Sequence, residues 1–210
     1  MEFRTVITIA RQFGSGGHEI GKMVAEKLQI PFYDKKIIAM AAEESGISDR
    51  IIRENEERAQ SGIIHAFNRS NRFFANQPFL SNQIQLNDQV FLIESEIIRD
   101  LANKGPCVVI GRSANYVLRE YLNCLRIFVH ADFQSRLERI KELYQMDDHK
   151  AEDFLRSQDK QRSHYYSFYT DQKWNAAENY DLAVNSTLFG IENTAAMIVL
   201  TAKMKNKISS

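Results

Sequence analysis

The feature that most constrains this chain is the stretch over residues 5–28, TVITIARQFGSGGHEIGKMVAEKL. It starts with an apolar run rich in β-branched residues over 6–10, which predicts a buried strand. A loop with three glycines in four positions follows, made of Gly14, Ser15, Gly16 and Gly17. Apolar residues then recur four apart over 18–28, which predicts a helix.

A strand, a glycine-rich loop and a helix in this order favour an anion-binding site. The arrangement turns backbone N–H groups and the positive end of the helix toward the ligand. Glycine allows the unusual dihedral angles of such a loop and the close approach of an anion. The sequence therefore predicts a phosphate-binding loop over residues 11–19, with an ordinary strand-to-helix turn as the alternative.

The loop departs from the P-loop pattern G-x-x-x-x-G-K-[ST]. A register over 16–23 puts Met23 at the hydroxyl position and its Gly-Lys pair inside the predicted helix. The register that directly follows the strand is the better one. It puts Gly17 at the lysine position and His18 and Glu19 at the hydroxyl positions. The usual cation of the loop is therefore missing.

Three side chains are candidates to replace that cation. Arg11 precedes the loop, His18 lies at the start of the helix, and Lys22 lies one helical turn later. A helical side chain leans toward the helix N-terminus, so Lys22 is able to approach a phosphate from there. The sequence does not choose among the three.

The composition is that of an ordinary globular protein, with 44% hydrophobic and 26% charged residues. The formal net charge is zero, so nothing global favours nucleic acid or an anionic membrane as a partner. No apolar run reaches the length of a membrane span, and the N-terminus has no secretory signal pattern. Cys107 and Cys124 lie in or beside apolar runs, which favours buried thiols over a disulfide or a metal pair. These features predict a cytoplasmic protein.

The rest of the chain alternates between strands and helices. Further apolar runs predict strands at 30–33, 107–110, 125–130 and 180–185. Helical patterns follow at 35–44, 47–59 and 84–101, after Asp132, after His149, and at 188–203. This alternation predicts an α/β fold with a five-stranded parallel sheet covered by helices on both faces.

Residues 46–83 are the least readable part, with aromatic residues interleaved with arginine, asparagine and glutamine. Such a pattern is compatible with base stacking. The neutral net charge favours an inserted substrate-binding lobe or a subunit contact, as in a homodimer, over nucleic acid.

Charged residues near the predicted strand ends are the other site candidates. Asp34 follows the second strand, on the edge where open α/β sheets bind ligands, although a helix N-cap explains it nearly as well. Arg112 follows the third strand, and its guanidinium suits phosphate. The pair of Arg136 and Arg139 shares one helical face, for which solvated surface arginines are the alternative. Asp159 and Arg162 share a face in the same way.

Five stretches together resemble the bacterial cytidylate kinase-like family, a branch of the nucleoside monophosphate kinase fold in the P-loop NTPase superfamily. They are ITIARQFGSGGHEIGKMVAEKL, IPFYDKKII, KGPCVVIGRSANYVL, RIFVHADFQSRLERI and the DKQR of 159–162. They cover most of the chain outside 46–83. The resemblance implies a single domain with a core of 1–45, 84–145 and 172–210. It also implies a helical acceptor-binding insertion over about 46–83 and a mobile helical lid over about 146–171.

The resemblance also implies roles for individual residues. The ATP phosphates are expected on the loop residues Arg11, Gly14, Ser15, Gly16, Gly17, His18 and Glu19. The acceptor is expected on Asp34, Arg112, Ser113, Arg156, Asp159 and Arg162. The positive charge for phosphoryl transfer is expected from Arg136, Arg139, Arg162 and Lys22. No metal ligand is expected from the protein, and Mg²⁺ is expected to arrive with ATP.

The chain also departs from true cytidylate kinases. Gly17 replaces the P-loop lysine, and Ser113 replaces the aspartate after Gly111-Arg112. An earlier lid arginine falls at Leu155, one position from Arg156.

The resulting hypothesis is a kinase that transfers a phosphoryl group from ATP to a nucleoside monophosphate such as CMP or dCMP. Phosphoryl transfer needs positioning and cancellation of charge rather than a nucleophilic side chain, which suits a glycine loop surrounded by arginines. One alternative is a kinase for another small acceptor. The other is a nucleotide-binding regulatory protein without transfer activity, which the glycine at position 17 favours.

Overall fold

The computed structural model describes residues 3–34 and 78–208. The helices expected at 35–44 and 47–59 lie outside these residues, as does most of the proposed insertion. The chain divides into two compact units, one of 1–34 with 98–210 and one of 35–97. The first unit carries the sheet.

All five predicted strands are present, and each boundary lies within two residues of the expected one. They are β1 (Val6–Arg11), β2 (Phe32–Tyr33), β3 (Val108–Ile110), β4 (Cys124–His130) and β5 (Leu182–Asn185). The strand order is β2-β3-β1-β4-β5, and every pairing is parallel. The predicted parallel sheet is therefore confirmed, with β1 at its centre.

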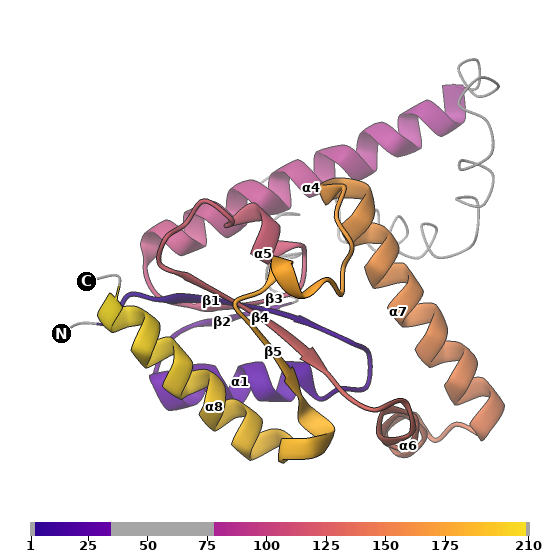
Figure 1. Cartoon of the computed structure of the whole chain (residues 1–210). Helices are drawn as coiled ribbons and strands as arrows, with labels where there is room; N and C mark the ends of the chain where they lie inside the picture. Colours follow the sequence, from indigo (N-terminus) through magenta and orange to yellow (C-terminus); the bar gives the residue numbers. More distant parts are fainter. Residues whose placement is uncertain (1–2, 35–77, 209–210) are drawn as a thin grey trace. The chain divides into compact units, whose positions relative to one another are not determined.

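The described helices follow the predicted alternation. They are α1 (Gly17–Leu28), α4 (Pro78–Lys104), α5 (Ala114–Val117), α6 (Phe133–Tyr144), α7 (Asp148–Thr170) and α8 (Ser186–Ile208). In Figure 1, α1 and α8 lie on one face of the sheet and α5 lies on the other. Two helices differ from the expectation. The helix α4 begins at Pro78 rather than at residue 84, since proline suits a first helical turn. The single turn α5 was not expected.

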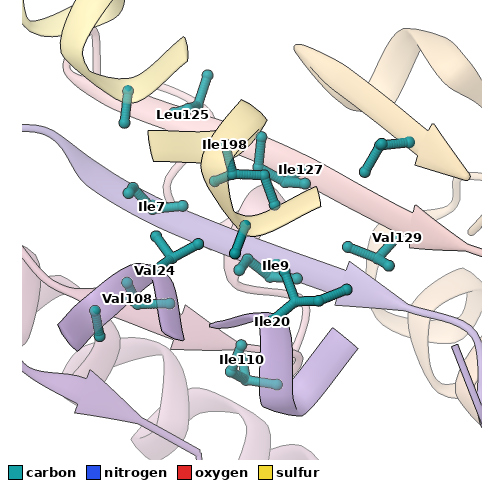
Figure 2. Packing of buried hydrophobic residues seen from close by; sticks show 14 residues of the cluster. Ile7, Ile9, Ile20, Val24, Val108, Ile110, Leu125, Ile127, Val129 and Ile198 are labelled. Carbon is teal, nitrogen blue, oxygen red and sulfur yellow. The ribbon is translucent and has the colours of Figure 1, made fainter. Parts of the chain in front are cut away.

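The main hydrophobic core lies between the sheet and the pair α1 and α8 (Figure 2). Ile9 of β1, Ile127 of β4, Ile20 of α1 and Ile198 of α8 have no exposed surface. A Cβ atom on Gly21 would lie 2.4 Å from Ile110 Cδ1, so this glycine lets α1 pack closely on β3. Gly21 therefore belongs to the helix packing and not to the anion loop.

Both cysteine thiols are free and buried, as the sequence predicted. Burial raises the pKa of Cys107 and the pKa of Cys124 to about 12. Within residues 3–34 and 78–208, no helix combines the length and the apolar character that crossing a membrane requires.

The parallel strands place all their carboxyl ends at one edge of the sheet (Figure 1). The strands that follow β1 first in the chain, β2 and β3, lie on one side of it, and the later strands β4 and β5 lie on the other. Open α/β sheets bind ligands at the edge where the strand order switches in this way. The loop after β1 lies at this switch point.

Candidate functional site

The loop between β1 and α1 has the geometry of an anion-binding turn. Gly14 and Gly16 have left-handed backbones, with φ of 77° and 74°. The helix α1 begins at Gly17, as the register directly after the strand predicted, and no side chain caps its N-terminus. The N–H of Ile20 donates to the Gly16 carbonyl at 2.9 Å and closes the first helical turn. The N–H groups ahead of it have no partner within the helix and are available to an anion.

A salt bridge between α6 and α7 holds the loop at Phe13. The N–H of Phe13 donates to Asp159 Oδ1 at 2.7 Å, and Arg136 Nη1 donates to the Phe13 carbonyl at 3.1 Å. Arg136 also forms a salt bridge with Asp159 Oδ2, and only 7% of its side chain is exposed. The two side chains thus bind both polar backbone groups of one loop residue. We call Arg136, Asp159 and Phe13 the loop clamp.

Arg162 of α7 adds a further contact to the start of the loop. Its Nη1 donates to the Arg11 carbonyl at 2.9 Å, and its guanidinium lies over the Phe13 ring, 5.2 Å from the ring centroid. Burial lowers the pKa of Arg162, although a guanidinium remains charged at neutral pH. The expected lid helix therefore lies against the loop in this structure.

Two residues for which the sequence predicted no individual role, Gln12 and Ser186, support the loop from the other side. Ser186, the first residue of α8, donates from Oγ to the Ser15 carbonyl at 2.7 Å. Gln12 donates its N–H to the Val129 carbonyl at 3.0 Å, and its Oε1 accepts from the N–H of Ala131 at 3.2 Å. A polar residue directly after a strand, at the start of a helix, is the only signal that the sequence carries for Ser186.

The two residues at the hydroxyl positions of the P-loop both bind side chains from other elements. His18 Nε2 lies 2.5 Å from Asp34 Oδ2, so the first turn of α1 is joined to the residue that follows β2. Glu19 forms a salt bridge with Arg139 of α6. The Arg139 guanidinium carbon lies 3.7 Å from the point where a Cβ on Gly16 would stand, which places its charge beside the loop.

The turn after β3 has an unusual backbone. Gly111, Arg112 and Ser113 are three consecutive residues in the left-handed region, with φ of 74°, 55° and 51°. Non-glycine residues adopt this region at a cost of about 1–3 kcal/mol each, and such strained residues cluster at active sites and ligand clamps. Ser113 Oγ is buried and has no hydrogen-bond partner among the described residues. Arg112 is therefore at the strand end that the sequence predicted, on a strained turn.

The Arg11 side chain crosses the start of α1 toward this turn. A Cβ atom on Gly17 would lie 2.5 Å from Arg11 Cβ, and one on Gly111 would lie 2.2 Å from Arg11 Nη1. Burial lowers the pKa of Arg11 well below its ordinary value, and the charges of Arg162 and Arg112 lower it further. The negative charge of Asp34 raises the pKa of Arg11 in part. Like charges gathered in this way favour an anionic ligand.

Two predicted site residues are not joined to the loop. Lys22 is exposed on α1, inside the helix. Arg156 is exposed on α7 and forms a salt bridge with Glu152 at 2.8 Å on the same helix. In the part of the chain that the structure describes, neither side chain forms a hydrogen bond or a salt bridge with the loop residues.

The described residues contain no group of three or more histidine, cysteine, aspartate or glutamate side chains that is arranged to hold a metal ion. The hydroxyl that binds Mg²⁺ in a P-loop is replaced here by His18, whose ring is bonded to Asp34. A nucleotide-bound Mg²⁺ that keeps several of its waters fits this arrangement better than an ion held by protein side chains.

Comparison with solved structures agrees with this architecture. An uncharacterized protein from Eubacterium ventriosum has a TM-score of 0.70 and 23% sequence identity, over 95% of this chain and 99% of that one. A shikimate kinase from Bacteroides thetaiotaomicron has a TM-score of 0.54 and 15% identity, over 95% and 99% of the two chains. At these identities the likeness shows the fold alone, which is the α/β fold of P-loop kinases.

Sequence comparison is more specific. No curated protein matches the chain significantly. The family model of the cytidylate kinase-like family matches residues 6–188, which include the loop, the turn after β3 and both α6 and α7. The chain therefore belongs to the cytidylate kinase-like family.

Proposed function

We propose that this protein is an ATP-dependent kinase that phosphorylates a nucleoside monophosphate such as CMP or dCMP. Membership of a kinase-like family and the P-loop kinase fold support a small-molecule kinase that uses ATP with Mg²⁺. The observation that carries the proposal is the uncapped glycine loop with arginines from β1, α6, α7 and the turn after β3 around it.

On the donor side, the free N–H groups at the start of α1 would bind the ATP phosphates. Arg139, beside Gly16, would neutralise charge on the migrating phosphoryl group once the nucleotide competes with Glu19 for its guanidinium. Arg136 would act differently from the sequence expectation. Because it is bound to Asp159 and to the Phe13 carbonyl, it would position the loop rather than bind phosphate.

On the acceptor side, the residues after β2 and β3 are neighbours because these strands pair in the sheet. Arg112 would bind the phosphate of the acceptor, since a guanidinium matches phosphate in charge and geometry. The unpartnered Ser113 Oγ and the Asp34 carboxylate offer polar groups to the rest of that nucleotide. Phosphoryl transfer then needs in-line placement of the two nucleotides and no covalent intermediate on the protein.

A coupled assay for ADP release tests the proposal. The protein would be given ATP, Mg²⁺ and, one at a time, CMP, dCMP, the other nucleoside monophosphates and shikimate. We expect turnover with CMP or dCMP well above the ATP-only rate. Turnover with shikimate as the acceptor, and with none of the nucleoside monophosphates, would select a kinase for a different small acceptor.

ATP binding without turnover on any acceptor would select the regulatory alternative. Calorimetry with ATP and Mg²⁺ in the same buffer separates this outcome from a failure to bind ATP, which would contradict the proposal altogether. A homodimer and a cytoplasmic location stay predictions of the sequence.

A further inference from the structure

Positions 11 and 17 of this chain differ from a P-loop in opposite ways. In the pattern G-x-x-x-x-G-K-[ST], the first position is glycine and the seventh is lysine. With the loop in its observed register, Arg11 occupies the first position and Gly17 the seventh. Compared with that pattern, the chain has a long cationic side chain at position 11 and lacks one at position 17.

The structure shows that these two changes depend on each other. A Cβ atom on Gly17 would lie 2.5 Å from Arg11 Cβ and 2.8 Å from Arg11 Cγ. Real Cβ atoms essentially never come this close to a neighbour, and Arg11 Cβ is fixed by its own backbone, so rotation of the side chain does not move it away. The stem of Arg11 thus fills the space where a side chain at position 17 would begin, so Gly17 is required by Arg11.

The guanidinium of Arg11 then continues toward the acceptor side of the sheet edge. Its Nη1 lies against Gly111, because a Cβ there would be 2.2 Å away. Among the residues that the structure describes, none forms a hydrogen bond or a salt bridge with this guanidinium. Its charged neighbours are two arginines, Arg112 and Arg162, and one carboxylate, Asp34. A half-buried cation beside two other arginines is stabilised by an anionic ligand.

We propose that Arg11 supplies, from the end of β1, the phosphate-binding charge that the lysine of a P-loop supplies from the start of the helix. This inference rests on the proposed function, since it assigns the ligand as the ATP polyphosphate. It places the charge between the donor loop and the turn that carries Arg112. It also assigns no phosphate-binding role to Lys22, the other long cation on α1.

The decisive experiment removes the charge of Arg11 while keeping its volume. Arg11→Met retains an aliphatic stem over Gly17, so the packing in that space persists. We expect the affinity for ATP with Mg²⁺, measured by calorimetry, to fall about 30-fold or more, because a charge-assisted phosphate contact is lost. Lys22→Met is the control variant, and its affinity for ATP should stay within about twofold of that of the unchanged protein.

A reciprocal exchange tests the geometry. Arg11→Gly should weaken ATP binding, and Gly17→Lys should weaken it as well because the new side chain collides with Arg11. The double variant Arg11→Gly/Gly17→Lys restores the P-loop pattern at both positions, and it should bind ATP at least tenfold more tightly than either single variant. Thermal unfolding of each variant would show that the folded state is present at the temperature of the binding measurement.

The outcomes are distinguishable from a failure of the proposed function. If the unchanged protein does not bind ATP, the proposed function fails and this role fails with it. If the unchanged protein binds ATP and Arg11→Met binds it equally well, only the inference about Arg11 is overturned. The inference would also be overturned if Lys22→Met greatly weakened ATP binding. The same holds if the double variant bound ATP no more tightly than the single variants.

Discussion

Asp159 and Arg136 form a salt bridge whose two members also bind the N–H and the carbonyl of the same loop residue, Phe13. Asp159 comes from α7 and Arg136 from α6, so the pair joins two helices to the loop at once. The side chains of Arg136 and Asp159 are only 7% and 20% exposed, which makes this salt bridge costly to break. Breaking a buried pair by removing one partner leaves an uncompensated charge and costs about 3–5 kcal/mol.

We therefore expect Asp159→Ala to lower the free energy of unfolding by about 3 kcal/mol, measured by urea denaturation. The control is Glu152→Ala on the same helix. It removes the partner of Arg156, whose side chain is 63% exposed, and should change stability by about 0.5 kcal/mol or less. Equal losses in the two variants would show that the loop clamp contributes no more than a surface pair does.

Gly14 and Gly190 both have positive φ, of 77° and 74°, and Gly190 combines it with a ψ of 173°, a region almost exclusive to glycine. Alanine at either position therefore carries a backbone cost of about 1–3 kcal/mol. Only at Gly14 would the new Cβ also lie 3.0 Å from the backbone carbonyl oxygen and the Cβ of Arg136. Nothing lies within 4 Å of the corresponding point at Gly190.

Gly14→Ala should destabilise the protein by about 2–5 kcal/mol, because the clash with α6 adds to the backbone cost. Urea unfolding under one set of conditions measures this loss, and Gly190→Ala reports a backbone cost without a clash. If Gly14→Ala costs no more than about 1 kcal/mol, α6 does not pack on the loop as closely as the structure places it.

Arg112→Ala separates the two halves of the proposed site. We expect the KM for the acceptor to rise about 30- to 100-fold, with the KM for ATP changed by about twofold at most, because Arg112 lies on the turn after β3. Steady-state kinetics with each substrate varied in turn measures both constants. A parallel rise in both KM values would mean that Arg112 is shared by donor and acceptor, and the acceptor site would need a new assignment.

Buried thiols should make the protein sensitive to alkaline pH. Burial raises the pKa of Cys107 and of Cys124 from 9.0 to about 12, so the folded state favours the neutral thiols. Burial also raises the pKa of Tyr180. The unfolded chain releases these protons more readily, so stability is complete below about pH 9 and declines as the pH approaches 12.

The urea midpoint should accordingly fall between pH 8.5 and pH 11. In the double variant Cys107→Ala/Cys124→Ala the fall should be smaller, because two of the titrating groups are gone. The comparison concerns the slope with pH and not the absolute stability, which the loss of two buried side chains lowers by itself. An unchanged slope would show that the thiols do not contribute to the alkaline transition.

The sequence predicted the sheet well because each strand is a short apolar run and the helices between the strands have clear periodicity. It also located Arg112 correctly, since a residue just after a buried strand has to lie at the sheet edge. Local patterns could not reveal the strained backbone there. Arginine and serine are not residues that favour positive φ, so Arg112 and Ser113 carry no signal of it.

The partners of the site residues depend on how the helices pack, which periodicity does not determine. Helical spacing placed Asp159 and Arg162 on one face of α7, and in the structure both side chains contact the loop. It could not show that their partners are the backbone groups of Phe13 and Arg11. The same limit applies to Arg11 and Gly17, whose contact joins positions six apart across the turn from strand to helix.

The contacts of α7 have a consequence for any opening movement of the enzyme. A helix that swung outward as a rigid body would have to release Phe13 through Asp159 and Arg11 through Arg162, so the loop after β1 would lose two of its supports at once. Outward movement of α7 to release a product would then be coupled to loosening of the loop after β1. Amide hydrogen exchange at residues 12–17 and along α7 should slow together when a nucleotide is held in place.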